Sequence, residues 1–205
     1  MFQRLITKSI LNKIKDYRHL DGWLSDQEAL GLYHIARQLP GNAVMVEIGS
    51  WQGKSAYCLC KGLRSGKVYS IDPFNADACM DEDNIATYRD KKGDRDLLAQ
   101  FKQNLDRLHV LDKVVIKQGY SYQFPQEFDK IHGLFIDGDH SIEGCRQDFE
   151  LYAPKLISGG FLAFHDYYAH RDELGPTYVI KNLVTPSAGF TFYGQYDSLW
   201  IARKR

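Results

Sequence analysis

The chain has 205 residues, of which 44% are hydrophobic and 25% charged, and its 26 basic residues balance its 26 acidic residues. A chain of this length buries enough surface to fold as one compact domain without disulfide or metal staples. A net charge of zero argues against a nucleic-acid partner, because binding to a phosphate backbone needs clustered lysine and arginine.

The first 41 residues predict an N-terminal helical cap, domain 1–41, which precedes a main domain at 42–205. Leu5, Ile10 and Ile14 recur at helical spacing, and Ser25 with Glu28 three residues later forms a capping-box pattern that starts a second helix. The N-terminus has no long apolar run, so we expect neither a signal peptide nor a membrane span. The four cysteines contain no CxxC pair, which favours reduced thiols and a cytoplasmic location.

From residue 43 onward, apolar strand patterns alternate with helical patterns. Strands are expected at 43–48, 67–72, 113–117, 131–136 and 160–165, helices at 53–63, 94–109 and 141–156, and a hairpin at 190–193 and 198–201 around a turn at 194–197. The alternation predicts an α/β fold: a Rossmann-like, doubly wound, mostly parallel seven-stranded sheet with an antiparallel C-terminal hairpin. The polar segment 75–92 is typical of an active-site lid.

The first strand leads into a glycine-containing turn, Glu47 to Ser55. Gly49 allows the chain to turn close to a ligand, and Gly53 opens the next helix, whose free N–H groups favour a polar or anionic group. Trp51 stands where a dinucleotide-binding GxGxxG sequence has its second glycine, so a pyrophosphate site is not expected. The carboxylate of Glu47 suits a cationic group such as an α-amine.

Two further strand ends carry polar residues that suit a nucleoside. Asp72 ends the second strand, where an acidic residue in Rossmann-like folds hydrogen-bonds ribose hydroxyls. Gly119 and Ser121 follow the third strand, where a small polar residue meets an adenine edge and glycine gives room. An ordinary loop is the alternative interpretation of this third segment.

The richest pattern lies after the fourth and fifth strands. If these strands are neighbours, five side chains converge: Asp137, Asp139, His140, His165 and Asp166. Carboxylates and imidazoles at this density suit a divalent ion such as Mg²⁺ or Mn²⁺. The alternative is that Asp137 caps the following helix and that the histidines are ordinary loop residues.

Taken together, these motifs resemble the class I S-adenosylmethionine-dependent methyltransferases. The branch with E-x-G-x-x-x-G-x-S, F-I-D-G-D-H-x-x-E and G-G-x-x-x-x-H-D is matched at Glu47–Ser55, Phe135–Glu143 and Gly159–Asp166. The similarity covers about residues 44–167 and includes small-molecule and sugar O-methyltransferases.

The resemblance implies a role for each matching residue. Cofactor-binding residues would be Glu47, Gly49, Ser50, Gly53, Ser55, Asp72, Gly119, Ser121 and Asp137. Divalent-metal ligands would be Asp137, His165 and Asp166, and the catalytic residues Asp137, His140 and His165. Catechol-type relatives carry Asn after the second metal-binding Asp, whereas this chain has Tyr167, so metal dependence is left open.

The implied activity is O-methylation of a small-molecule acceptor, a sugar or a phenolic hydroxyl, with S-adenosylmethionine as cofactor. Methyl transfer needs an aligned acceptor and removal of its proton, for which His140 or His165 is a candidate base. Three alternatives remain: a non-catalytic S-adenosylmethionine-binding protein, a nicotinamide (NAD-dependent) oxidoreductase, and a metal-dependent hydrolase. Assembly into a homo-oligomer is left open.

Overall fold

A computed structural model describes residues 2–76 and 82–205 of the chain. Seven strands form one sheet in the order β3-β2-β1-β4-β5-β7-β6. They are β1 (Ala43–Ile48), β2 (Gly66–Asp72), β3 (Val114–Gln118), β4 (Ile131–Ile136), β5 (Leu156–Phe164), β6 (Phe190–Tyr196) and β7 (Leu199–Lys204). Strands β1 to β5 are parallel, and β7 lies antiparallel between β5 and β6. The predicted α/β fold is confirmed.

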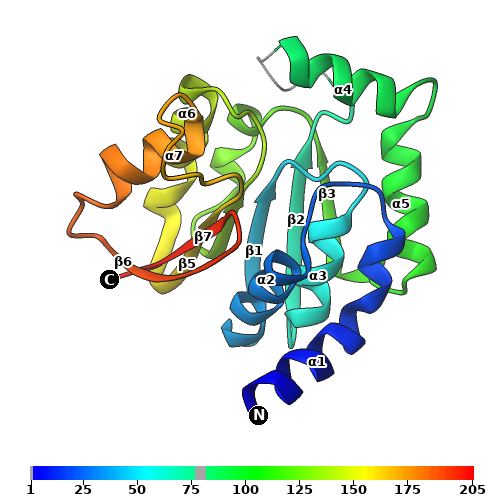
Figure 1. Cartoon of the computed structure of the whole chain (residues 1–205), viewed down its shortest axis with the longest axis horizontal. Coiled ribbons are helices and arrows are strands. Elements are labelled where there is room, and N and C mark those ends of the chain that lie inside the picture. The colour runs from blue at the N-terminus through cyan, green and yellow to red at the C-terminus, as the bar shows by residue number, and fades with distance from the viewer. Residues whose placement is uncertain (1, 77–81) are drawn as a thin grey trace.

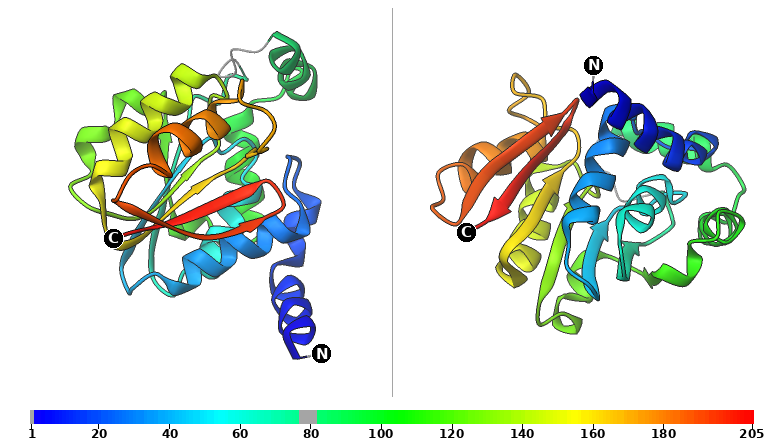
Figure 2. Two further views of the ribbon diagram at one scale, coloured as in Figure 1. Left: turned by 60° about the vertical axis from the view of Figure 1, so that its left-hand side comes forward. Right: turned by 90° about the horizontal axis from the view of Figure 1, so that it is seen from below.

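The helices cover both faces of the sheet (Figures 1 and 2). They are α1 (Phe2–Ile14), α2 (Asp26–Gln38), α3 (Lys54–Gly62), α4 (Glu82–Lys92), α5 (Leu97–Arg107), α6 (Ile142–Tyr152) and α7 (Gly175–Val179). Strand residues alternate between two buried clusters because successive side chains point to opposite faces. Phe135 packs with α2, α3 and α5 on one face, whereas Leu134 and Ile136 pack with α6 and α7 on the other.

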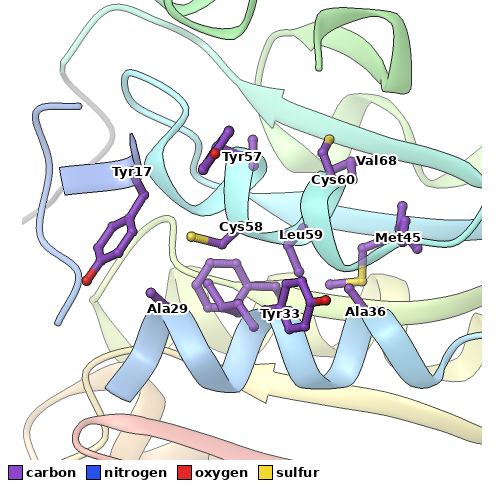
Figure 3. Packing of buried hydrophobic residues seen from close by; sticks show 14 of the residues in the cluster. Tyr17, Ala29, Tyr33, Ala36, Met45, Tyr57, Cys58, Leu59, Cys60 and Val68 are labelled. Carbon is purple, nitrogen blue, oxygen red and sulfur yellow. The ribbon is translucent and has the colours of Figure 1, made fainter. Parts of the chain in front are cut away.

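The N-terminal helices share their core with the sheet. Figure 3 shows Ala29, Tyr33 and Ala36 of α2 packed against Cys58 and Leu59 of α3, close to the strands. The predicted capping box at the start of α2 is present, since Ser25 and Glu28 exchange both hydrogen bonds. The division into domains 1–41 and 42–205 stays a prediction. Among the described helices, none combines the length and apolar character needed to cross a membrane.

Several element boundaries differ from the expectation. For example, β5 begins at Leu156 rather than at 160, and α5 spans Leu97–Arg107 rather than 94–109. The helix expected to reach residue 156 ends at Tyr152, and a 3₁₀ turn that contains Pro154 follows, because proline removes a helix hydrogen-bond donor. The C-terminal hairpin turns at Asp197 and Ser198, not at 194–197. Asp197 adopts a φ of 52°, which a tight hairpin turn requires and which aspartate tolerates. Gly194 lies inside β6, where the pairing with β7 shifts register.

Two helical segments were not expected. Part of the polar segment 75–92 forms α4, while residues 77–81 of that segment lie outside the described part of the chain. Between β5 and β6 the chain forms α7 and then a π-helical turn at Ile180–Val184. Buried Val179, Ile180 and Val184 anchor this second segment on the sheet face that carries α6.

Candidate functional site

A cavity of about 1040 Å³ opens at the carboxyl ends of β1 to β5. The predicted site residues that line it are Gly49, Ser50, Ser55, Asp72, Gly119, Ser121, Asp137, His140, His165 and Asp166. Its outer walls come from the segment 21–24 before α2, from Thr87 and Tyr88 of α4, and from the loop after Asp166. Because parallel strands end at the same edge, residues far apart in the sequence meet in one cavity.

The turn after β1 fits closely against the end of β4. Gly49 has a φ of 85°, and a Cβ at this position would lie 2.0 Å from the backbone oxygen of Asp137. The Asp137 N–H donates to the Ile48 carbonyl at 2.8 Å. Only glycine fits at residue 49, so the first motif and the Asp137 motif are held in direct contact.

Asp72 ties this turn to β2. Its carboxylate accepts the backbone N–H groups of Ser50 at 2.7 Å, Trp51 at 2.9 Å and Phe74 at 2.6 Å. Burial raises the pKa of Asp72, and the three backbone donors act in the opposite direction. Trp51 has a φ of 47°, which is strained for a bulky residue. The Asp72 hydrogen bonds to Ser50 and Trp51 hold the backbone in this conformation.

Two predicted binding residues lie beneath the cavity wall rather than on it. Glu47 is fully buried and accepts hydrogen bonds from the hydroxyls of Ser50 at 2.9 Å and Ser70 at 2.8 Å. Burial raises its pKa to about 7, against the effect of the serine hydroxyls. Gly53 caps α3, and its Cα faces Leu105 and Phe101 of α5. Both residues therefore support the turn from below.

The structure brings together the acidic and imidazole side chains that follow β4 and β5. His165 Nδ1 lies 3.2 Å from Asp137 Oδ1 and 3.1 Å from Asp166 Oδ2. His140 Nε2 lies 3.6 Å and 3.4 Å from the same two oxygens. Asp166 adopts a φ of 56°, a backbone strain of the kind that is concentrated at functional sites.

The other nitrogen of His165 faces Glu28 of α2. His165 Nε2 lies 3.3 Å from Glu28 Oε2, and both side chains are buried. Burial alone would lower the pKa of His165, but the carboxylates, Asp137 first among them, raise it well above its usual value. Burial would likewise raise the pKa of Glu28, but His165 lowers it to about 2. Both groups are therefore charged at neutral pH.

A divalent ion fits the oxygen and nitrogen donors on this wall. One donor atom each from Asp137, His140 and Asp166 lie within 4.8 Å of one another. Two carboxylates and an imidazole form a donor set suited to Mg²⁺ or Mn²⁺. This group includes His140 and not His165, whose two ring nitrogens face carboxylates. The ligand role expected for His165 stays a prediction.

At the opposite end of the cavity, Ser121 contacts a residue that the sequence did not single out. Its hydroxyl donates to Asp148 Oδ1, while its backbone oxygen accepts a hydrogen bond from the Tyr152 hydroxyl at 2.6 Å. Asp148 and Tyr152 both lie on α6. The third motif and α6 therefore form one wall.

Three aromatic rings pack together on the outer wall. The Trp23 and Trp51 centroids are 5.8 Å apart, those of Trp23 and Tyr88 4.8 Å, and those of Trp51 and Tyr88 5.3 Å. The Lys91 ammonium lies 4.0 Å from the centroid of Trp23. We refer to Trp23, Trp51 and Tyr88 as the aromatic cluster.

Sequence patterns missed Glu28 and Asp148 as site components. The capping box explained Glu28 locally, and Asp148 lies within a helical pattern. No local sequence signal identifies Asp148, because its contact with Ser121 depends on how α6 packs.

The strand order and the cavity at the carboxyl edge of the sheet define the fold of class I methyltransferases. Residues 46–167 match the family model described as a methyltransferase domain, and the chain belongs to this family.

Three similar proteins illustrate the relationship. The uncharacterised protein R132 of Acanthamoeba polyphaga mimivirus is 28% identical over 154 residues, which are 68% of this chain and 60% of the viral protein. The O-methyltransferase TomG from Streptomyces achromogenes, solved with S-adenosylmethionine, gives a TM-score of 0.65 at 14% identity over 97% of this chain and 88% of TomG. A Bacillus cereus O-methyltransferase, solved with S-adenosylhomocysteine, gives a TM-score of 0.65 at 15% identity. The match covers 97% of this chain and 90% of the Bacillus protein. At these identities the two structures show a shared fold, and the chain spans less than two thirds of the viral relative.

Proposed function

We propose that the chain transfers a methyl group from S-adenosylmethionine to a hydroxyl group of a small molecule. The observation that supports this most is the convergence of the separate motifs on one cavity of about 1040 Å³. A typical pocket for one drug-sized ligand is about 300–1,000 Å³, so this cavity has room for a cofactor and an acceptor together. Membership of the methyltransferase-domain family supports the same activity.

The cofactor would extend along the carboxyl edge of the sheet. Its amino-acid part would lie on the Gly49–Ser50 turn, and its ribose would lie near Asp72. Its adenine would lie against Gly119 and Ser121. Glu47 accepts a hydrogen bond from the Ser50 hydroxyl, so it would act on the cofactor through Ser50. Its carboxylate would also favour a cationic amine nearby. The Asp72 carboxylate accepts hydrogen bonds from three backbone N–H groups. It would therefore accept hydrogen bonds from the ribose hydroxyls with its remaining lone pairs.

The cofactor supplies an activated methyl group, and a divalent ion, where bound, lowers the pKa of the acceptor hydroxyl. The acceptor oxygen forms a bond to the methyl carbon as the carbon–sulfur bond breaks, and the hydroxyl proton passes to a base. Both histidines line the cavity, but both ring nitrogens of His165 face carboxylates, so His140 is the better candidate base where no ion is bound. Asp137 and Asp166 position His140. Where an ion is bound, these three residues would hold it, and the proton would pass to solvent.

The acceptor would enter between the aromatic cluster and the loop after Asp166. Tyr168, His170 and Arg171 of that loop line the cavity. Aromatic faces stack on a flat ring, and the polar groups of the loop orient its substituents. These features suit a sugar or a phenolic ring.

Calorimetry tests the proposal directly. We expect S-adenosylhomocysteine to bind metal-stripped protein with a Kd on the order of 1 μM, and NAD not to bind. A panel of phenols and sugars with labelled S-adenosylmethionine, with and without Mg²⁺ or Mn²⁺, should identify a methylated product. The Asp137→Asn variant should lose at least about 100-fold in rate, while Asp129→Asn, at an exposed carboxylate, serves as the matched control.

The outcomes separate the alternatives. Full activity of Asp137→Asn with unchanged cofactor affinity would rule out the placement of the reaction at this cluster. Binding of NAD without S-adenosylhomocysteine would favour an oxidoreductase. Cofactor binding without any product across the panel would favour a non-catalytic binding protein.

A further inference from the structure

Asp21 and Trp23 together form a pair of groups on the outer wall of the cavity that suits a positively charged amine. Asp21 supplies a carboxylate, and Trp23 supplies an indole ring that stays 42% exposed although it packs within the aromatic cluster. Both residues line the cavity. A carboxylate beside an aromatic ring binds an ammonium group through its charge and through the quadrupole of the ring. The chemistry described above makes no use of this pair.

The segment that carries the pair is fixed to the start of α3. The Lys54 ammonium donates a hydrogen bond to the Gly22 carbonyl at 2.8 Å, and the Gln52 side-chain amide donates one to Asp21 Oδ2 at 3.3 Å. Gly22 adopts a φ of 134°, which glycine allows and other residues rarely adopt. The carboxylate and the ring of Trp23 are therefore held in place by contacts that a ligand does not need to supply.

An ammonium group of the chain itself lies at this position. Lys91 Nζ, from α4, is 4.0 Å from the centroid of the Trp23 ring and 3.6 Å from Asp21 Oδ1. The second distance exceeds the about 2.7–2.9 Å of a charge-assisted hydrogen bond, and the Lys91 and Asp21 side chains are 39% and 37% exposed. An exposed ion pair of this kind contributes little to stability. A ligand ammonium in direct contact with Asp21 would therefore replace Lys91 favourably.

The charge of the cavity as a whole disfavours an anionic ligand. Among the described residues, seven carboxyl side chains line the cavity, against one lysine and one arginine. The arginine, Arg171, is itself paired with Glu173 at 2.8 Å. The ion and the sulfonium of the proposed function offset part of this excess of negative charge. A cavity with such an excess concentrates cations and repels anions.

We infer that Asp21 and Trp23 bind a cationic amine of the methyl acceptor, at the position that Lys91 Nζ occupies in this structure. The inference rests on the proposed function, which places the acceptor between the aromatic cluster and the loop after Asp166. It narrows the acceptor to a hydroxyl compound that also carries an amine, such as an amino sugar or a phenolic amine. Because the amine displaces Lys91, binding of the acceptor is coupled to the contacts of α4.

A role of Lys91 solely as an anchor for α4 makes a different prediction. In that case Lys91 would compete with no ligand, and its removal would change the binding of charged and neutral phenols by the same factor. A shared site makes the change depend on the charge of the ligand. The ratio of affinities is therefore the quantity to measure.

The experiment titrates three phenols by calorimetry, at pH 7, into the protein loaded with S-adenosylhomocysteine. Tyramine, para-propylphenol and para-hydroxyphenylpropionate share the phenol ring and a two-carbon spacer, and they end in an ammonium, a methyl and a carboxylate group respectively. Tyramine should bind about 10-fold more tightly than propylphenol, and the propionate more weakly than either.

Two variants test the two halves of the inference. Asp21→Asn removes the charge, so the preference for tyramine over propylphenol should fall to within about 3-fold. Lys91→Met removes the competing ammonium but keeps an unbranched side chain, so tyramine should bind at least about 3-fold more tightly while propylphenol binds as before. Lys102→Met, at an exposed lysine on α5, is the matched control and should change neither affinity.

Equal affinities for tyramine and propylphenol in the unchanged protein, or a ratio that neither variant alters, would overturn the assignment. So would a failure of tyramine to bind. The comparison of the three phenols needs no variant, so it still decides the matter if circular dichroism shows that a variant does not fold. Binding of S-adenosylhomocysteine without any preference for the ammonium would refute only this inference. If S-adenosylhomocysteine does not bind, the proposed function is refuted, and the same titrations without it test the cation site on its own.

Discussion

Glu28 shows how one side chain serves three parts of the structure. It completes the capping box of α2 by accepting a hydrogen bond from the Ser25 N–H at 2.7 Å. Its other oxygen accepts a hydrogen bond from the hydroxyl of Ser198, in the C-terminal hairpin turn, at 2.6 Å. It also faces His165, which in turn contacts Asp137 and Asp166. A single carboxylate therefore connects the N-terminal segment and the C-terminal hairpin to the cluster of Asp137, His165 and Asp166.

We expect Glu28→Gln to lower the free energy of unfolding by about 3 kcal/mol at pH 7, because it leaves the buried charge of His165 with one partner fewer. The pKa of Glu28 is about 2 in the folded protein, against about 4.3 in an unfolded chain. A depressed folded pKa means that this stabilisation is present above the unfolded value and is lost as the pH falls toward 2. The difference between wild type and variant should therefore shrink between about pH 5 and pH 2.

Urea denaturation across this pH range measures the effect. Glu150→Gln, at an exposed carboxylate on α6, is the matched control and should change stability by less than about 0.5 kcal/mol. A destabilisation by Glu28→Gln that stays constant from pH 7 to pH 3 would show that the ion pair with His165 is not its cause.

At the scale of elements, α4 stands apart from the other helices. Among the residues of α4 whose side chains the structure describes, Thr87, Arg89 and Asp90 are exposed. Tyr88 packs against both Trp23 and Trp51, and the Lys91 ammonium lies over the Trp23 ring and 3.6 Å from Asp21 Oδ1. These contacts hold α4 beside the cavity, which Thr87 and Tyr88 line. The role of the polar segment as a lid stays a prediction.

We expect Tyr88→Ala to release α4 locally. Each aromatic pair contributes about 0.5–1.5 kcal/mol beyond its buried area, so the loss of two pairs should speed amide exchange in α4 by about 10-fold or more. Hydrogen exchange followed by mass spectrometry should show this change in α4 and none in α5. Phe192→Ala removes an exposed ring on β6 and should leave the exchange of α4 unchanged. Unchanged exchange in Tyr88→Ala would mean that other contacts hold the helix.

At the scale of the whole molecule, the cavity is closed by segments from both ends of the chain. The strand ends form its floor, while residues 21–24, Glu28 and Ser198 come from the N-terminal segment and the C-terminal hairpin. A ligand that bridges these parts binds only the folded protein. Binding should therefore stabilise the whole fold and not only the cavity.

Ligand-dependent thermal unfolding tests this coupling. S-adenosylhomocysteine at 100 times its Kd should add about 2.7 kcal/mol to the free energy of unfolding, which corresponds to a rise in Tm of about 5–10 °C for a chain of this size. Removal of divalent ions with a chelator should lower the Tm again if Asp137, His140 and Asp166 hold a metal. NAD at the same concentration is the control. An equal rise with NAD would indicate a general nucleotide site.

Much of the architecture follows from the sequence because it depends on local patterns. The predicted strands β1 and β4 have the observed bounds, and the Ser25–Glu28 capping box marks the start of α2. The site could also be placed at one edge, because acidic and glycine residues follow successive parallel strands and such strand ends lie together. Hydrophobic periodicity and turn residues determine this much without any knowledge of the packing.

Only the tertiary structure decided which side chains meet. Ser121 and Asp148 are 27 residues apart, and their contact depends on the register of α6 against β3. Glu28 reaches Ser198, 170 residues away, because α2 packs beside the C-terminal hairpin. Tyr88 is held by two tryptophans of other segments, so the polar pattern of α4 did not reveal the position of this helix. Local patterns set the period and the ends of each element, whereas contacts between elements depend on how their faces pack.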